Sequence, residues 1–369
     1  MDTCNEQLPI HGDVLEAVLS HLPLIRLLPA SRVSKSWNAA VSSALLVSNN
    51  TKPWLIIHTQ NSRHPYPTTT HAYDPASNVW IQILHPPIHY VSTLRSSQSN
   101  LLYMLSQSKL SLSFDPLHLT WHHAAGPKVS RIDPVVAVVG GHVVVAGGAY
   151  DFEDDPLAVE VYDLRSQRWT KSDPMPESFN QSASSLWLSV ASGDSHLFVM
   201  EKSSGVTHSF NPNNDTWSGP YDMRPDDRVF YSVIGFSDDK LVVIGMLGDA
   251  EDVDGIKLWE VNCESFEFEE IGEMPASLVE NLKSQNLQIS SIDVSMGGNM
   301  AYIYISSRPE EVIVCEFIDG GGCRWCSVVN TVANGWSVMD KLAFTCSKVG
   351  MEELQRATRS ESRRFVVKR

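Results

Sequence analysis

The sequence predicts a mainly β protein, a β-propeller preceded by a small helical module. Two observations indicate this: one short offset recurs six times along most of the chain, and an apolar helix bracketed by two Leu-Pro pairs precedes the first copy. The length of 369 residues suits one large architecture with an appendage.

Composition narrows the class of protein. No stretch approaches the roughly 18 apolar residues of a membrane span, and residues 1 to 7 lack the features of a secretion signal. We therefore expect an intracellular protein, in the nucleus and/or the cytoplasm, with no membrane partner. A net charge of −15 disfavours nucleic acid as a partner, and six scattered cysteines fit reduced thiols.

The recurring offset joins an acid or amide to an aromatic residue six positions later. The strongest copies are "AYDPASNVW", "SFDPLHLTW", "VYDLRSQRW" and "SFNPNNDTW". The six pairs are Asp74/Trp80, Asp115/Trp121, Asp163/Trp169, Asn211/Trp217, Asn262/Phe268 and Asp319/Trp325. Their acid or amide positions are 41, 48, 48, 51 and 57 residues apart. A period near 50 is typical of a propeller.

The offset has a physical reason. Asp or Asn starts a turn through its own side-chain hydrogen bonds, and the aromatic ring on the next strand covers the seam between two blades. Two further apolar runs precede each hairpin, such as "VVAVV" and "HVVVAGG" in the third unit, which predicts four strands a blade. The alternative is a β-sandwich with coincidental Trp spacing.

The repeat resembles the kelch family over roughly residues 53 to 347, with the family's double glycine at Gly147 and Gly148. The resemblance implies a kelch-type β-propeller. Its first unit begins at "WLIIH" without an innermost strand, and the run "DKLAFTCS" near the end of the chain can supply one. Six blades closed by this late strand are predicted, with seven as the alternative.

The helical module begins with a helix that Asp13 and Glu16 are expected to cap and that Pro23 ends. Pro29 is expected to start another helix. Apolar residues at helical spacing share one face of each expected helix. On the first helix they are Val14, Leu15, Val18, Leu19 and Leu22. On the helix expected to start at Pro29 they are Val33, Trp37, Ala40 and Val41. About 40 residues are too few to sustain a fold alone, so burial against another surface is expected.

This module, "LPIHGDVLEAVLSHLP" followed by "RVSKSW", resembles an F-box. The resemblance implies three helices that bind a Skp-family adaptor and, through it, the cullin of an SCF-type ubiquitin ligase. The positions that it assigns to adaptor binding are Leu8, Pro9, Val14, Leu15, Val18, Leu19, Leu22, Pro23, Val33 and Trp37. The alternative is a helical cap packed on the propeller.

The predicted domains are a helical module at residues 1–44, a linker at 45–52, the propeller at 53–347 and a basic, disordered tail at 348–369. Together the two resemblances imply a receptor whose propeller holds a protein for ubiquitination, with no catalysis of its own. A kelch-propeller enzyme or specifier protein, and a scaffold unrelated to ubiquitin, remain the alternatives.

No cofactor or metal is expected, because Cys323 and Cys326 lack further ligands at metal spacing. Two acidic loops, each joining the second and third strands of a blade, are candidates for substrate binding, since such loops emerge on one face. Their carboxylates are Asp151, Glu153, Asp154, Asp155, Asp249, Glu251, Asp252 and Asp254. The alternative is that these loops are merely solvated.

Overall fold

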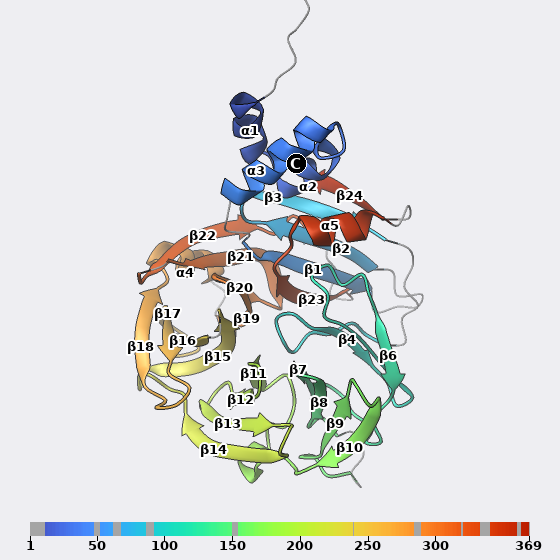
Figure 1. Cartoon of the computed structure of the whole chain (residues 1–369). Helices are drawn as coiled ribbons and strands as arrows, with labels where there is room; N and C mark the ends of the chain where they lie inside the picture. Colours follow the sequence, from blue (N-terminus) through green and yellow to red (C-terminus); the bar gives the residue numbers. More distant parts are fainter. Residues whose placement is uncertain are drawn as a thin grey trace, which may run out of the picture.

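The computed structural model describes residues 12–47, 52–61, 68–85, 92–149, 154–238, 240–283, 289–318, 320–332, 340–359 and 363–368. Six antiparallel sheets stand around a central axis as the blades of a propeller (Figure 1). The innermost strands lie around the centre of the ring, and the outermost strands form its rim. This confirms the predicted propeller of six blades.

Four blades take their strands in chain order. The third has β7 (Val135–Val139), β8 (His142–Ala146), β9 (Val159–Asp163) and β10 (Arg168–Ser172); the fourth has β11 (Leu188–Ser192), β12 (Leu197–Glu201), β13 (Val206–Asn211) and β14 (Thr216–Asp222). The fifth has β15 (Val229–Ser237), β16 (Lys240–Gly248), β17 (Val253–Val261) and β18 (Phe268–Glu273). The sixth has β19 (Asp293–Gly297), β20 (Met300–Ile305), β21 (Arg308–Phe317) and β22 (Cys323–Val329).

The second blade is the slightest of the six. Its sheet contains β4 (Leu102–Leu105), β5 (Lys109–Ser113) and β6 (His122–Ala125), and a single bridge between Arg95 and Tyr103 stands in the innermost position. Two short helical elements lie between blades: the 3-10 turn η1 (Glu177–Phe179) and the helix α4 (Ala276–Lys283).

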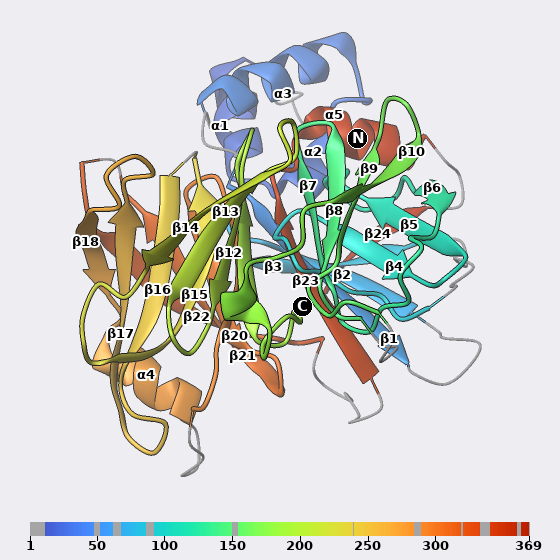
Figure 2. The ribbon, with the colours of Figure 1, turned by 90° about the horizontal axis from the view of Figure 1, so that it is seen from below.

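Burial on both faces explains the composition of the inner strands. Val143, Val144 and Val145 on β8 are all fully buried, because each blade is covered by a neighbour on either side. Figure 2 shows this side-by-side packing from below. Strands of this kind are near-continuous runs of β-branched residues instead of alternating apolar and polar ones.

The first blade closes the ring with a strand from the other end of the sequence. Its order is β23 (Asp340–Ser347), β1 (Trp54–Asn61), β2 (Thr68–Asp74), β3 (Val79–Leu84) and β24 (Arg364–Lys368). The β23–β1 ladder runs from Trp54 opposite Ser347 to Asn61 opposite Asp340. The predicted closure by "DKLAFTCS" is therefore confirmed.

The repeated acid or amide has the predicted role in its turn. Asp74, Asp163, Asn211 and Asn262 each accept a hydrogen bond from the backbone N–H two residues later, and Asp115 accepts three from its turn. Asp319 lies outside the described residues. Each such side chain replaces a backbone acceptor where the hairpin reverses direction.

The repeated tryptophans cover the seams between blades. Trp169 Nε1 donates to Ala125 O at 2.9 Å and Trp217 Nε1 donates to Asp173 O at 3.3 Å, in each case on the preceding blade. Trp325 and Phe268 are half-buried and pack against the hydrophobic core, whereas the buried Nε1 of Trp121 has no partner among the described residues. Gly147 and Gly148 have φ of 68° and 66°, a backbone that favours glycine.

The prediction of a disordered tail is wrong. Residues 351–358 form the helix α5 (Met351–Thr358), and β24 adds a fifth strand to the first blade through its pairing with β3. Leu354 and Ala357 on α5 are buried, and Phe365 and Val367 on β24 pack against the same hydrophobic cluster. The tail orders because these few apolar side chains cover the outer edge of the first blade.

Three helices precede the propeller: α1 (Asp13–Ser20), α2 (Leu24–Ala30) and α3 (Lys35–Val47). Gly12, not Asp13, occupies the capping position of α1, and Asp13 lies in its first turn. Pro29 lies near the end of α2 instead of starting a helix, and the helix that was expected to start there begins at Lys35 as α3. The helical module extends to Val47, past the predicted boundary at residue 44. None of the helices described is long and apolar enough to cross a membrane.

Candidate adaptor-docking surface

The helical module has a small core of its own. Leu15 and Leu19 on α1 are 2% and 1% exposed. They belong to a cluster with residues of α2 and α3, namely Leu27, Ala30, Ala40, Val41 and Ala44. The inward face of α1 therefore holds the module together and has no apolar surface left for a partner.

A second apolar face of α1 is open. Val14, Val18 and Leu22, which we call the outer stripe, are 65%, 48% and 39% exposed. Their spacing of four residues aligns them along α1 and the turn that follows it. The sequence predicts that these three residues share one face with Leu15 and Leu19; the structure divides that face, because Leu15 and Leu19 pack in the module core and the other three stay exposed.

The other predicted docking residues lie in varied surroundings. Pro23 is half-buried before α2, and Val33 is 62% exposed in the turn between α2 and α3. Trp37 packs partly against the module core, and its backbone N–H donates to Ser34 Oγ at 3.2 Å, which caps α3. Leu8 and Pro9 lie outside the described residues.

Sequence reasoning missed Leu46, which is 73% exposed on α3. Its signal was present in the chain: Leu46 lies two positions beyond the buried Ala44, a spacing that places it away from the helix face that packs inward. Leu46 lies beyond the predicted module boundary at residue 44.

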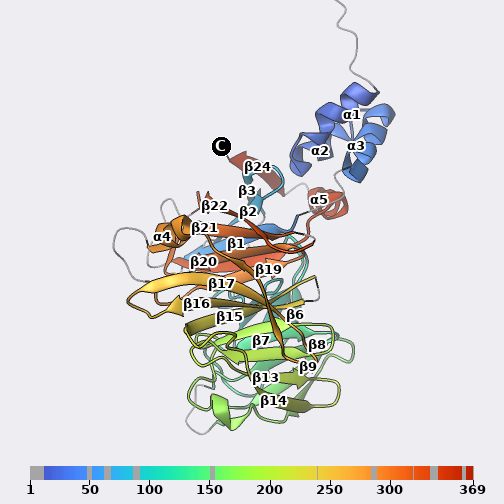
Figure 3. The same ribbon diagram turned by 90° about the vertical axis from the view of Figure 1, so that its left-hand side faces the viewer.

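The module is fixed to the propeller through α2 and α5. Ile25 and Leu28 belong to one buried cluster with Trp54 of the first blade and Leu354 of α5. Arg32 Nη2 also donates to Thr358 Oγ1 at 3.2 Å. Figures 1 and 3 show α2 and α5 next to each other, with α1 farther from the ring. Packing on the propeller and an open outer stripe therefore coexist in one module.

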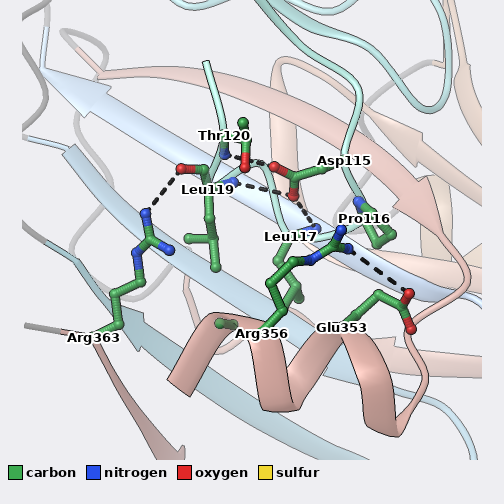
Figure 4. A pocket seen from close by; sticks show the side chains of 9 residues that line it. Asp115, Pro116, Leu117, Leu119, Thr120, Glu353, Arg356 and Arg363 are labelled. Atoms are coloured by element: carbon green, nitrogen blue, oxygen red, sulfur yellow. Dashed lines mark hydrogen bonds and ion pairs between the residues drawn. The ribbon is translucent and has the colours of Figure 1, made fainter. Parts of the chain in front are cut away.

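A pocket beside α5 lies where the tail meets the turn between β5 and β6 of the second blade (Figure 4). Arg363 Nη2 donates to Leu119 O at 3.0 Å, and Arg356 Nη2 lies 3.8 Å from Glu353 Oε1 as an ion pair. Asp115 accepts bonds from the backbone of its own turn. The polar groups that line the pocket are thus engaged with one another.

The acidic loops have mixed roles. Asp155 accepts a bond from Leu157 N at 2.9 Å, and Asp249 accepts bonds from Glu251 N and Asp252 N at 2.8 Å. These two carboxylates stabilise their own turns. Asp154, Glu251 and Asp252 are the remaining described carboxylates of the loops, and Asp254 lies on β17; Asp151 and Glu153 lie outside the described residues.

Antiparallel order places both acidic loops on one face of the ring. Each follows the second strand of its blade, β8 or β16, and precedes the third. Alternating strand direction returns every such loop to the face where the innermost strands begin.

Among the described residues no group of three or more His, Cys, Asp or Glu has the arrangement of a metal site.

A helical module with an open apolar stripe, fixed to the rim of a six-bladed propeller, fits the class of F-box substrate adaptors. The F-box domain matches residues 6–49, and a kelch motif matches residues 131–176. The chain is 42% identical over 375 residues to the Arabidopsis thaliana F-box/kelch-repeat protein At1g23390, which covers 97% of this chain and 95% of the relative.

The chain therefore belongs to the plant F-box/kelch-repeat proteins. A second Arabidopsis thaliana relative, the F-box/kelch-repeat protein At4g39550, is 32% identical over 94 residues, or 24% of each chain. Both predicted resemblances are confirmed. F-box domains generally bind Skp1-family adaptors, which is the role that the open stripe on α1 fits.

Proposed function

We propose that this chain is the substrate-recognition subunit of an SCF-type ubiquitin ligase. The F-box docks on a Skp-family adaptor, the adaptor connects it to a cullin, and the propeller holds the protein to be ubiquitinated. The chain contributes position, not catalysis: transfer is performed by a separate enzyme of the assembly.

The outer stripe is the observation that supports this proposal most strongly. Three large aliphatic side chains stay exposed on α1 and the turn that follows it, although α1 buries Leu15 and Leu19. Full burial of a Val or Leu side chain contributes about 1.5–3 kcal/mol, so covering the stripe supplies several kcal/mol toward association. A partner with a complementary apolar groove removes this surface from water when it binds.

The attachment of the module to the propeller supports the same role. The buried cluster of Ile25, Leu28, Trp54 and Leu354 restricts how the module turns relative to the ring. A receptor with this joint presents its target at a set position relative to the adaptor. Limited motion raises the effective concentration of the target at the transfer site.

Reconstitution tests the proposal. The full chain is co-expressed with a plant Skp-family adaptor and a cullin with its RING partner, and the assembly is resolved by size exclusion. We expect a stable complex that contains all components, with the chain present once for each adaptor. Migration of the chain apart from the adaptor at micromolar concentration would contradict the proposed function.

A further inference from the structure

A second exposed apolar surface lies on the propeller itself. Ile132, Leu186 and Trp187, which we call the Trp187 patch, are 50%, 64% and 61% exposed. They lie in the two connections that lead into β7 and β11, the innermost strands of the third and fourth blades. Nothing in the repeat pattern requires an apolar residue at these positions.

Backbone hydrogen bonds hold the two connections side by side. Ser185 N donates to Asp133 O at 2.8 Å, and Ile132 N donates to Gly148 O at 2.7 Å. Gly148 N in turn donates to Ala183 O at 2.6 Å. The three members of the patch are therefore presented on the same part of one propeller face.

The backbone under Trp187 is fixed before any partner arrives. Trp187 N and Leu188 N both donate to Ser184 O at 3.0 Å, and Trp187 O accepts a bond from Lys202 N at 3.0 Å. Leu186 N donates to Ser184 Oγ at 3.2 Å. An exposed tryptophan on a fixed backbone is the type of residue that dominates protein interfaces, because little backbone entropy is lost on binding.

Carboxylates border the patch. Innermost strands begin on the face to which the acidic loops return, and the acidic loop of the third blade follows Gly148 directly. Asp154 and Asp155 lie near enough to Arg131, the neighbour of Ile132, to oppose the lowering of its pKa by burial. Because Arg131 is itself paired with Glu160 at 3.1 Å, the loop carboxylates leave this border negative.

We propose that the Trp187 patch is the anchor point for the target, and that the target segment carries a bulky apolar side chain flanked by Lys or Arg. The inference rests on the proposed function, since it names the substrate class of the same receptor. The apolar side chain packs on Trp187, and the cations face Asp154 and Asp155 of the third blade. Charge complementarity adds to the association rate and confers salt sensitivity.

Peptide display on the full chain bound to its Skp-family adaptor tests this. The probe is a library of random twelve-residue peptides, followed by fluorescence anisotropy with the best synthetic peptide at several salt concentrations. We expect enriched peptides with an aromatic or large aliphatic residue between basic ones. Trp187→Ala should weaken the peptide by at least about 30-fold, because interface tryptophans of this kind are hot spots.

Two matched controls sharpen the comparison. Ile318→Ala removes an exposed isoleucine, 43% exposed, after the third strand of the sixth blade and hence on the opposite face, so it should leave peptide affinity unchanged while Ile132→Ala lowers it. Asp154→Asn should weaken binding and flatten its dependence on salt. Asp155 is kept because it stabilises its own turn.

Several outcomes would overturn the inference. Enrichment of acidic or purely polar peptides, no enrichment at all, or equal affinity of the wild type and Trp187→Ala each does so. So does a wild-type dimer that Trp187→Ala converts to a monomer, since the patch would then bind a second copy. Adaptor binding by Trp187→Ala separates these results from failure of the proposed function, because the patch lies outside the F-box module.

Discussion

Trp80 Nε1 donates a hydrogen bond to Val329 O at 3.1 Å, which joins the first blade to the sixth. Trp80 is 6% exposed and lies opposite Tyr73 in the β2–β3 ladder, with the two ring centroids 5.3 Å apart. The ring of blades is thus closed twice: by the β23–β1 ladder on the inside and by this indole nearer the rim.

Trp80→Phe should lower the free energy of unfolding by about 1–2 kcal/mol, because the hydrogen bond to Val329 O across the seam is lost while an apolar ring is kept. Denaturant unfolding followed by circular dichroism measures the change. Trp187→Phe is the control, with an expected change within about 0.5 kcal/mol, since Trp187 is exposed. Equal effects of the two substitutions would contradict the role of Trp80 at the seam.

Leu354→Ala should destabilise the protein by about 2–5 kcal/mol, because it leaves a cavity in the cluster that joins α5 to α2 and the first blade. Thermal melting of the full chain measures this. Val366→Ala on β24, where the side chain is 41% exposed, should cost less than about 1 kcal/mol. An unchanged melting temperature for Leu354→Ala would indicate that the tail does not support the module.

Gly148→Ala should destabilise the third blade. The backbone there has φ of 66°, and an added Cβ would lie 2.5 Å from Ile132 O. We expect a loss of about 1–3 kcal/mol in denaturant unfolding. Gly141→Ala is the matched control in the same blade, because its Cβ meets nothing within 4 Å and its φ is ordinary. Similar stabilities of the two variants would contradict the requirement for glycine at position 148.

Acid should destabilise the joint between the first and second blades. Burial lowers the pKa of His118 to about 4, and Asp115 opposes this shift. The pKa of a histidine in the unfolded chain is about 6.5. The unfolded chain therefore binds more protons between these values, so stability is lost as pH falls through that window. The expected slope is about 1.4 kcal/mol per pH unit for this histidine.

Unfolding midpoints at pH 7 and pH 5 measure the effect. His118 Nδ1 donates to Ser113 O at 3.2 Å and Nε2 lies 2.9 Å from Thr345 Oγ1, on the closing strand. His118→Gln keeps polar groups near both partners without a titrating ring, so its acid sensitivity should be smaller. A slope identical to that of the wild type would exclude His118 as a contributor.

The sequence predicts the blades well because their turns are local. Asp163 and Trp169 are six residues apart, and a hairpin satisfies both within that distance. The tail was missed because its stabilising contacts are distant: Leu354 packs in a cluster with Ile25, more than 300 positions earlier, and a short polar helix shows no such partner in its own sequence.

The sequence predicts the helix that carries the candidate site but not which side of that helix faces outward. Helical spacing places Val14, Leu15, Val18, Leu19 and Leu22 along one broad apolar arc of α1. Periodicity does not say which part of so broad an arc packs inward. That is decided by α3, which covers Leu15 and Leu19 and leaves the outer stripe open.

The affinity of the outer-stripe variant for a Skp-family adaptor tests the central claim most directly. Val14→Asp with Val18→Asp places two charges where apolar contact is expected, without touching the module core, and Val329→Asp on the exposed edge of β22 is the control. Biolayer interferometry should show adaptor binding weakened by more than about 100-fold for the double variant and unchanged for the control. Affinity of the double variant within threefold of the wild type would contradict docking through α1.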